Sequence, residues 1–172
     1  MHAERRQLLK TGGSALLLAL LAPFGGIPTV HALVRIDYAE RPVREFLKMH
    51  FASSRAFTAR GMDDKERFLT RRFRTRLYKY FQNAAKAENA LPMVADPFTG
   101  SMNARDYSIG KAKVRSEKAW VPVTFTEGGN QWITTYLLRN DQERNDERWR
   151  IDDIQDVRGM LLTDALKKLL TK

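Results

Sequence analysis

The stretch Ala119–Leu138, AWVPVTFTEGGNQWITTYLL, decides the fold of this chain. β-Branched and aromatic residues alternate with small or polar ones on both sides of Glu127–Asn130, which contains two adjacent glycines. Such a pattern is typical of two strands joined by a tight turn. The stretch therefore predicts an antiparallel hairpin made of the strands Ala119–Thr126 and Gln131–Leu138.

Two more strands extend the sheet beyond this hairpin. Tyr107–Arg115 precedes it, joined by the turn Ser116-Glu117, and Arg148–Ile154 follows a charged loop. After Gly159, leucines recur at helical spacing up to Leu170, which indicates a short amphipathic helix. We therefore predict a curved antiparallel sheet of about four strands with a short C-terminal helix.

The first half of the chain has a helical period instead. Apolar residues predict a helix over about Arg41–Ala59, with Pro42 as an early helical residue. From Leu69 to Ala84 a second apolar stripe lies on one helix face, and Thr70 either caps this helix or lies within a longer one. The chain is thus expected to be an α+β protein whose N-terminal helices pack on the sheet.

Residues 1–32 have the layout of a secretory signal peptide. Arg5 and Arg6 give a basic start, Ala15–Leu21 is an unbroken apolar run, and Val30-His31-Ala32 offers a cleavage site near Ala32. The alternative is an N-terminal membrane anchor, although the apolar run is shorter than the roughly 20 residues that span a bilayer. We therefore expect a cleaved signal peptide.

The run Arg5-Arg6-Gln7-Leu8-Leu9-Lys10 resembles the twin-arginine export signal of bacteria. An ordinary Sec signal that carries two arginines remains the alternative. Because both signals direct export across the inner membrane, we predict a periplasmic protein. Its single mature domain would span residues 33–172 and contain no membrane span.

Composition excludes several classes of site. The 172-residue chain has no cysteine, so it holds no disulfide, thiolate nucleophile or Cys-ligated metal. The sequence also has no metal-ligand cluster, nucleophile elbow or phosphate loop, and we expect neither a cofactor nor a metal. The formal net charge of +10 points to an acidic partner or an anionic surface.

The excess positive charge lies in the first half of the mature chain. Residues 33–86 carry 14 Lys+Arg and 6 Asp+Glu, whereas residues 87–172 carry 13 of each. A basic run in the second helix is the candidate site for a protein partner or an anionic envelope component, and the alternative is a solvated helix face. Nucleic acid is not the expected partner, because the run lacks an aromatic stacking face. The run comprises Arg71, Arg72, Arg74, Arg76 and Lys79.

The hairpin pattern also predicts which residues share a sheet face. A symmetric turn at Gly128-Gly129 sets Phe125 opposite Trp132, with Tyr136 on the same face. The face then either forms a pocket for a small apolar ligand, lined by these three aromatic residues, or receives a closely packed helix. Continuing through the preceding turn adds only small residues to this face, namely Ser108, Gly110 and Ala112.

Three titratable residues are candidates for chemistry. Asp153 shares the strand parity of inward-facing residues, and it is either a buried base or ligand anchor, or it bonds backbone near a bulge or strand end. We prefer the second interpretation. His50 lies on the apolar side of the first helix, where a satisfied core histidine is more common than a base. Asp96, which precedes Pro97, is most simply a turn residue.

Four short segments carry a resemblance to known proteins: Val43…Phe46-Leu47, Phe68-Leu69-Thr70…Leu77, Asp96-Pro97-Phe98 and Trp149-Arg150-Ile151-Asp152-Asp153-Ile154. With the order of helices and strands, they resemble the nuclear-transport-factor-2-like (cystatin-like) fold. More narrowly, the chain resembles the bacterial exported family called domain of unknown function 3828. The resemblance implies a curved sheet wrapped around a helix, often with a cone-shaped cavity, and it transfers no catalytic residues.

These observations lead to one principal expectation for function. The chain is expected to be an exported, soluble, non-enzymatic envelope protein that binds a small apolar ligand or a protein partner. The first alternative is a periplasmic protein–protein module, such as a toxin-neutralising immunity protein. The second is a cavity enzyme that uses a buried aspartate as a base.

Overall fold

The computed structural model describes residues 30–53, 55, 57–86, 95–141 and 148–170. The basic and apolar parts of the predicted signal peptide lie outside the described residues. The predicted cleavage position, Ala32, falls within the first helix. Cleavage there and a mature domain from residue 33 stay predictions.

The first helix, α1 (Val30–Ala52), starts and ends earlier than predicted. Pro42 lies in its interior and not in its first turn, so the predicted bounds were wrong. Proline is disfavoured inside helices, because it removes one backbone hydrogen bond. The helix nevertheless continues through Pro42, and the residues on either side of it, Ala39, Val43 and Phe46, are fully buried on one face.

Two short elements and a longer helix follow. α2 (Ala59–Met62) leads into the 3-10 helix η1 (Asp63–Phe68), and α3 spans Arg71–Ala84. The Thr70 hydroxyl accepts a hydrogen bond from the Phe73 backbone N–H at 3.1 Å, so Thr70 caps α3. The predicted apolar stripe is confirmed as the buried face of this helix, through Phe73, Leu77 and Tyr80.

The sheet is antiparallel and has five strands, in the order β1-β3-β4-β5, with β2 also paired to β3. The single first strand predicted over Tyr107–Arg115 is divided into two short strands that lie along the same edge of β3. The strand bounds are β1 Asp106–Ile109, β2 Lys113–Arg115, β3 Lys118–Glu127, β4 Asn130–Asp141 and β5 Arg148–Gln155.

The central hairpin has the predicted register. Phe125 lies opposite Trp132, and Val121 lies opposite Tyr136. The turn residues Gly128 and Gly129 both have positive φ angles, 54° and 87°, a conformation that glycine adopts without steric cost.

The prediction for the first strand's face is wrong. β1 places Tyr107, and not Ser108, opposite Phe125. Of the three small residues predicted on this face, only Ala112 is buried. The chain between β1 and β2 contains one residue more than a regular strand needs, and such an insertion turns the preceding side chains to the other face.

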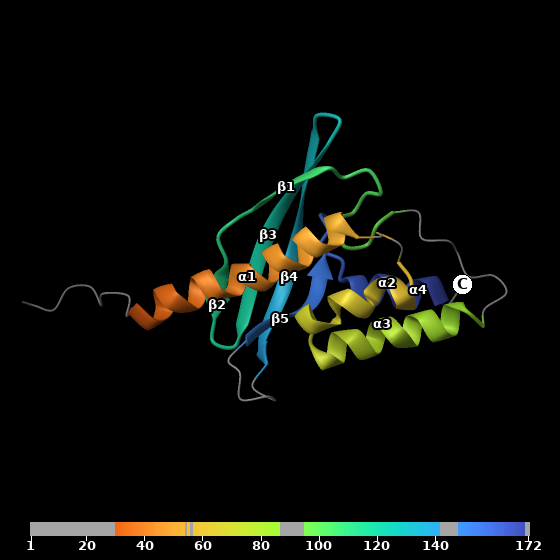
Figure 1. Cartoon of the computed structure of the whole chain (residues 1–172), viewed down its shortest axis with the longest axis horizontal. Coiled ribbons are helices and arrows are strands. Elements are labelled where there is room, and N and C mark those ends of the chain that lie inside the picture. The colour runs from red at the N-terminus through yellow and green to blue at the C-terminus, as the bar shows by residue number, and fades with distance from the viewer. Residues whose placement is uncertain (1–29, 54, 56, 87–94, 142–147, 171–172) are drawn as a thin grey trace, which may run out of the picture.

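The helices pack on one face of this sheet (Figure 1). α1 crosses the strands, while α3 lies beside the C-terminal helix α4 (Leu162–Leu170), whose position after Gly159 was predicted. Phe46 of α1 is fully buried and contacts four other aromatic rings, those of His50, Phe68, Phe98 and Tyr136. Within the described ranges, none of the helices is sufficiently long and apolar to cross a bilayer.

Candidate functional site

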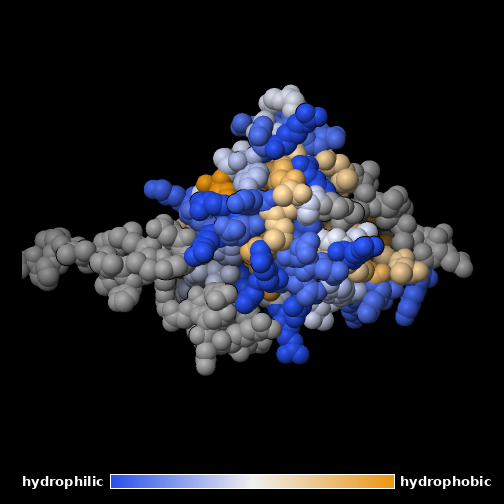
Figure 2. Space-filling model, viewed as in Figure 1, coloured by the Kyte–Doolittle hydropathy of each residue, from blue (hydrophilic) through white to orange (hydrophobic). Residues whose placement is uncertain are grey.

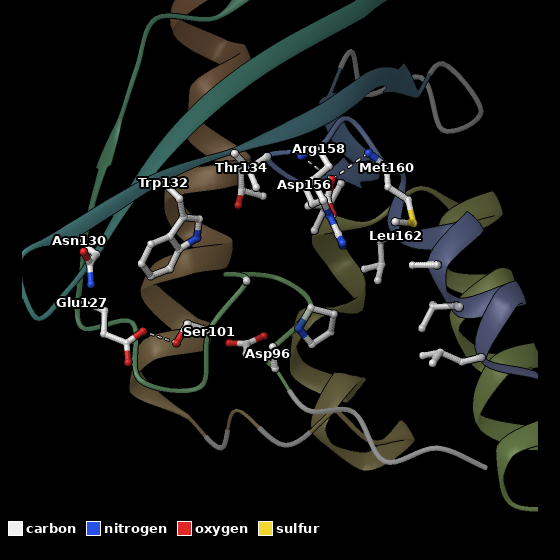
Figure 3. Close-up of a pocket in the computed structure, with 18 residues that line it drawn as sticks. Asp96, Ser101, Glu127, Asn130, Trp132, Thr134, Asp156, Arg158, Met160 and Leu162 are labelled. Carbon is white, nitrogen blue, oxygen red and sulfur yellow. Dashed lines mark hydrogen bonds and ion pairs between the residues drawn. The ribbon is translucent and has the colours of Figure 1, made fainter. Parts of the chain in front are cut away.

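A pocket of about 650 Å³ lies between the 95–101 loop, the β3–β4 hairpin, the end of β5 and α4 (Figure 3). Its two ends differ in chemistry. One end is lined by side chains near the tip of the hairpin, and the other is lined by the apolar face of α4.

The α4 end of the pocket is apolar because this helix is strongly amphipathic. Its leucines face β5 and the pocket, whereas Asp164, Lys167 and Lys168 are exposed. Side chains from β5 and from the loops complete this wall. The apolar lining comprises Ala95, Pro97, Ile154, Val157, Met160, Leu162, Ala165, Leu166 and Leu169.

The hairpin end of the pocket is polar with one aromatic wall. Glu127 and Asn130 are paired across β3 and β4, and Trp132 lies two residues farther along β4 on the same face. The Ser101 hydroxyl donates a hydrogen bond of 2.5 Å to Glu127 Oε2. Strand alternation therefore brings a carboxylate, an amide and an indole to one end of the pocket.

The 95–101 loop forms the pocket floor, and two aromatic side chains of β4 hold it on the sheet. The Trp132 indole N–H donates to the Thr99 carbonyl at 2.7 Å, and the Tyr136 hydroxyl donates to the Phe98 carbonyl at 2.7 Å. Burial raises the pKa of Tyr136 well above its usual value, so the hydroxyl remains a donor. Gly100 has a φ of +86°, and a Cβ there would lie 3.0 Å from the indole nitrogen, so this position requires glycine.

A buried hydrogen bond anchors the same loop to α1. His50 Nε2 donates to Asp96 Oδ2 at 2.6 Å, and both residues are about 1% exposed. Asp96 also accepts hydrogen bonds from the Phe98 backbone N–H and the Thr99 hydroxyl, each at 3.0 Å. Asp96 is therefore the predicted turn residue. His50 is buried in the core as predicted, but it is only partly satisfied, because its buried Nδ1 has no hydrogen-bond partner among the described residues. The contact between His50 and Asp96 was not predicted.

Asp153 follows the interpretation that we preferred from the sequence. Its Oδ1 accepts from the backbone N–H groups of Ile154 and Thr163, and its Oδ2 accepts from the Thr163 hydroxyl at 2.5 Å. It is 4% exposed. It pairs with Leu137, directly after the register shift that lies between Leu137 and Leu138. Asp153 therefore joins β5 to the first turn of α4 and does not line the pocket.

The basic run of α3 is only partly available to a partner. Arg72 is paired with Asp152 at the β5 bulge, and Arg74 is paired with Glu66 at 3.2 Å. Arg76 makes a long hydrogen bond to Thr163. Arg71 and Lys79 remain exposed on the outer side of the helix, where Figure 2 shows mostly hydrophilic side chains on the face that carries α1 and α3.

The aromatic residues predicted to line one pocket lie in two different places, the hydrophobic core and the pocket beside α4. Phe125 and Tyr136 are fully buried, so the close packing of helices explains these two positions. Trp132 alone among the predicted ligand-binding residues lines the pocket. Sequence reasoning missed Glu127 and the α4 leucines as lining residues, although the hairpin register and the amphipathic period of α4 pointed to their faces.

Asp156 organises the turn after β5, which lines the pocket. Its environment predicts that the stability of the fold depends on pH. Burial raises the pKa of this carboxyl, but hydrogen bonds from Met160 and Arg158 outweigh that effect, so the pKa lies below its ordinary value of 3.8. A carboxyl with a lowered pKa in the folded state stabilises the fold above its ordinary pKa, and this contribution is lost as the pH falls through the lowered value.

We therefore expect the free energy of unfolding to fall on acidification below the ordinary pKa of Asp156, and to fall less steeply in Asp156→Asn. Urea unfolding across the acidic range measures both slopes. Asp106→Asn, at an exposed position of β1, is the matched control and should retain the wild-type slope. Equal slopes in wild type and Asp156→Asn would contradict the prediction.

The chain matches no protein-family model, no curated protein and no solved structure.

Proposed function

We propose that this chain is an exported, non-catalytic envelope protein that binds a small, largely apolar ligand in the pocket beside α4. The observation that carries the proposal is the apolar wall on α4 facing a pocket with a polar opposite end. The volume of about 650 Å³ lies within the range of roughly 300–1,000 Å³ typical of small-molecule sites. Such a pocket orients an elongated ligand, with its apolar part along α4.

The two buried aspartates near the pocket, which include the candidate base Asp153, have their oxygens engaged within the protein. Asp153 gives both of its oxygens to hydrogen bonds with Ile154 and Thr163. Asp96 likewise accepts from His50 and from its own loop. A general base needs an oxygen within reach of a substrate proton. We therefore favour a ligand-binding protein over a cavity enzyme that uses a buried aspartate as its base.

The finer parts of the proposal come from the sequence. They are periplasmic localisation, the nuclear-transport-factor-2-like cone, and membership of the domain of unknown function 3828 family. A helix packed across an antiparallel sheet supports the cone. A protein partner or an anionic envelope component at Arg71 and Lys79 remains the alternative. Fewer basic side chains support it than the five that the sequence suggested, because the other three have partners within the protein.

Filling the pocket tests the proposal. Ala165 lies on the pocket wall, and Ala165→Phe places a ring in the space that the ligand would occupy. We expect native mass spectrometry of the wild-type protein, purified from its own periplasm, to show a bound small molecule. We expect the variant to lose it, together with at least about tenfold in affinity for 1-decanol, because overlap with bulk that cannot move costs more than 1.4 kcal/mol.

The control variant is Gln82→Phe, which adds the same ring to the exposed face of the neighbouring helix α3. It should keep the ligand and the wild-type affinity for 1-decanol. Circular dichroism and thermal unfolding confirm that both variants are folded. Equal ligand retention in the two folded variants would rule out this pocket as the binding site.

A further inference from the structure

The charge of the pocket lining is opposite in sign to that of the chain. The chain has a formal net charge of +10, yet three carboxylates and a single arginine are the charged groups of the described lining. They are Asp96, Glu127, Asp156 and Arg158. A ligand in this pocket therefore meets a local field that favours positive charge.

Three of these four charges are already paired within the protein. Arg158 donates through its guanidinium to Asp156 Oδ2, with distances of 3.1 and 2.9 Å, which leaves neither of the two residues as the main recognition group. Asp96 is saturated by His50, Phe98 and Thr99. Glu127 is left as the carboxylate that can face a ligand.

Glu127 has one oxygen held and one oxygen free for a ligand. Oε2 accepts the hydrogen bond from Ser101 at 2.5 Å, which fixes the carboxylate at the polar end of the pocket. Oε1 has no protein donor within the part of the chain that the structure describes. A carboxylate oxygen that lacks a protein donor gains most from a charged donor, because charge-assisted hydrogen bonds are about twice as strong as neutral ones.

The indole of Trp132 provides a second group that attracts a cation. Its N–H is engaged by Thr99, and one face packs on Phe125, with ring centroids 6.1 Å apart at an angle of 26°. The ring is thereby held in one orientation on the pocket wall, beside Glu127 and Asn130 (Figure 3). Tryptophan is the most favourable aromatic partner for a cation.

We infer that the ligand is a cationic amphiphile, a primary alkyl ammonium compound. Its ammonium group donates to Glu127 Oε1 and lies near Trp132, and its alkyl chain runs along the leucines of α4. This inference rests on the proposed function, because it names the chemical class of ligand for the same pocket. An alkyl carboxylate of equal length would bring its charge next to Glu127 and be repelled.

Three probes with the same ten-carbon chain separate the inference from the proposed function: decylammonium, 1-decanol and decanoate. Calorimetric titration at neutral pH, below the micelle concentration of each probe, gives the three affinities. We expect decylammonium to bind about tenfold more tightly than 1-decanol, since only the ammonium adds the attraction of a full positive charge to its hydrogen bond with Glu127. Decanoate should bind more weakly than 1-decanol.

Glu127→Gln removes the charge and keeps an oxygen that accepts from Ser101. We expect this variant to bind decylammonium and 1-decanol with similar affinities, because the charge that distinguishes the two head groups is gone. Asp106→Asn removes one negative charge at an exposed position outside the pocket and should keep the tenfold preference.

The outcomes distinguish the two claims. Binding of 1-decanol without a preference for decylammonium, or a preference that survives in Glu127→Gln, overturns the cationic ligand and leaves the apolar pocket in place. Failure of all three probes to bind the wild-type protein overturns the proposed function, and the inference with it.

Discussion

Asp96→Ala is expected to lower the free energy of unfolding by about 2–6 kcal/mol, because each buried donor that loses its acceptor costs about 1–3 kcal/mol. Asp96 is 1% exposed, and it accepts from His50 at 2.6 Å, from the Phe98 backbone N–H and from the Thr99 hydroxyl. Alanine leaves the His50 and Phe98 donors buried without an acceptor, whereas the Thr99 hydroxyl still has the Ser101 carbonyl at 2.7 Å. The loop that forms the pocket floor would lose its anchor on α1.

Chemical unfolding measures this loss. Asp96→Asn keeps an oxygen for the Phe98 N–H but loses the charge opposite His50, so its cost should lie between wild type and Asp96→Ala. Asp106→Ala, at an exposed carboxylate, is the control, and it should change stability by less than about 0.5 kcal/mol. A change of that small size in Asp96→Ala would mean that the pair with His50 does not anchor the loop.

Phe46→Ala is expected to cost about 3–5 kcal/mol, the range measured for removing a buried phenylalanine ring. Phe46 is fully buried and lies where α1, η1, the 95–101 loop and the sheet meet. Its ring is 5.3 Å from that of Phe98 and 6.1 Å from that of Tyr136, in edge-to-face geometries that add to the burial energy. Alanine would leave a cavity at this junction.

The same unfolding experiment, with the m-value as a check on compactness, tests this prediction. Phe46→Leu refills most of the space and should recover more than half of the loss. Ile133→Ala is the matched surface control, because Ile133 is 51% exposed, and its cost should stay below about 1 kcal/mol. Equal costs for Phe46→Ala and Ile133→Ala would show that the junction is not tightly packed.

The sequence predicted most of the sheet because its signals are local. Alternating residues and two adjacent glycines specify the β3–β4 hairpin, and the register at Phe125 and Trp132 followed from the turn alone. The apolar stripe of α3 was equally readable, whereas the sequence left open whether Thr70 caps this helix or lies within a longer one. Each of these features is set by residues within a few positions of one another.

The positions of two irregularities in the strands were not fixed by the same reasoning, although a bulge was one of the settings offered for Asp153. An extra residue between β1 and β2 exchanged the faces of Tyr107 and Ser108, and a register shift in β4 and β5 lies beside Asp152 and Asp153. A bulge has no strong sequence signal, because many residue types occupy it, and the surrounding packing decides where it forms. The sheet face of a side chain can be assigned by counting residues from a turn. This assignment is therefore reliable only as far as the next bulge.

The α+β class, the hairpin and its register could be derived from the sequence by itself, and the sequence favoured backbone bonding by Asp153 without predicting its contact with α4. Only the tertiary structure paired His50 with Asp96, 46 residues away, and set Glu127 and Trp132 at the opposite end of a pocket from α4. The physical reason is the distance along the chain over which each feature is determined. Backbone conformation responds to neighbouring residues, whereas a pocket is formed by segments that meet only after the core has packed.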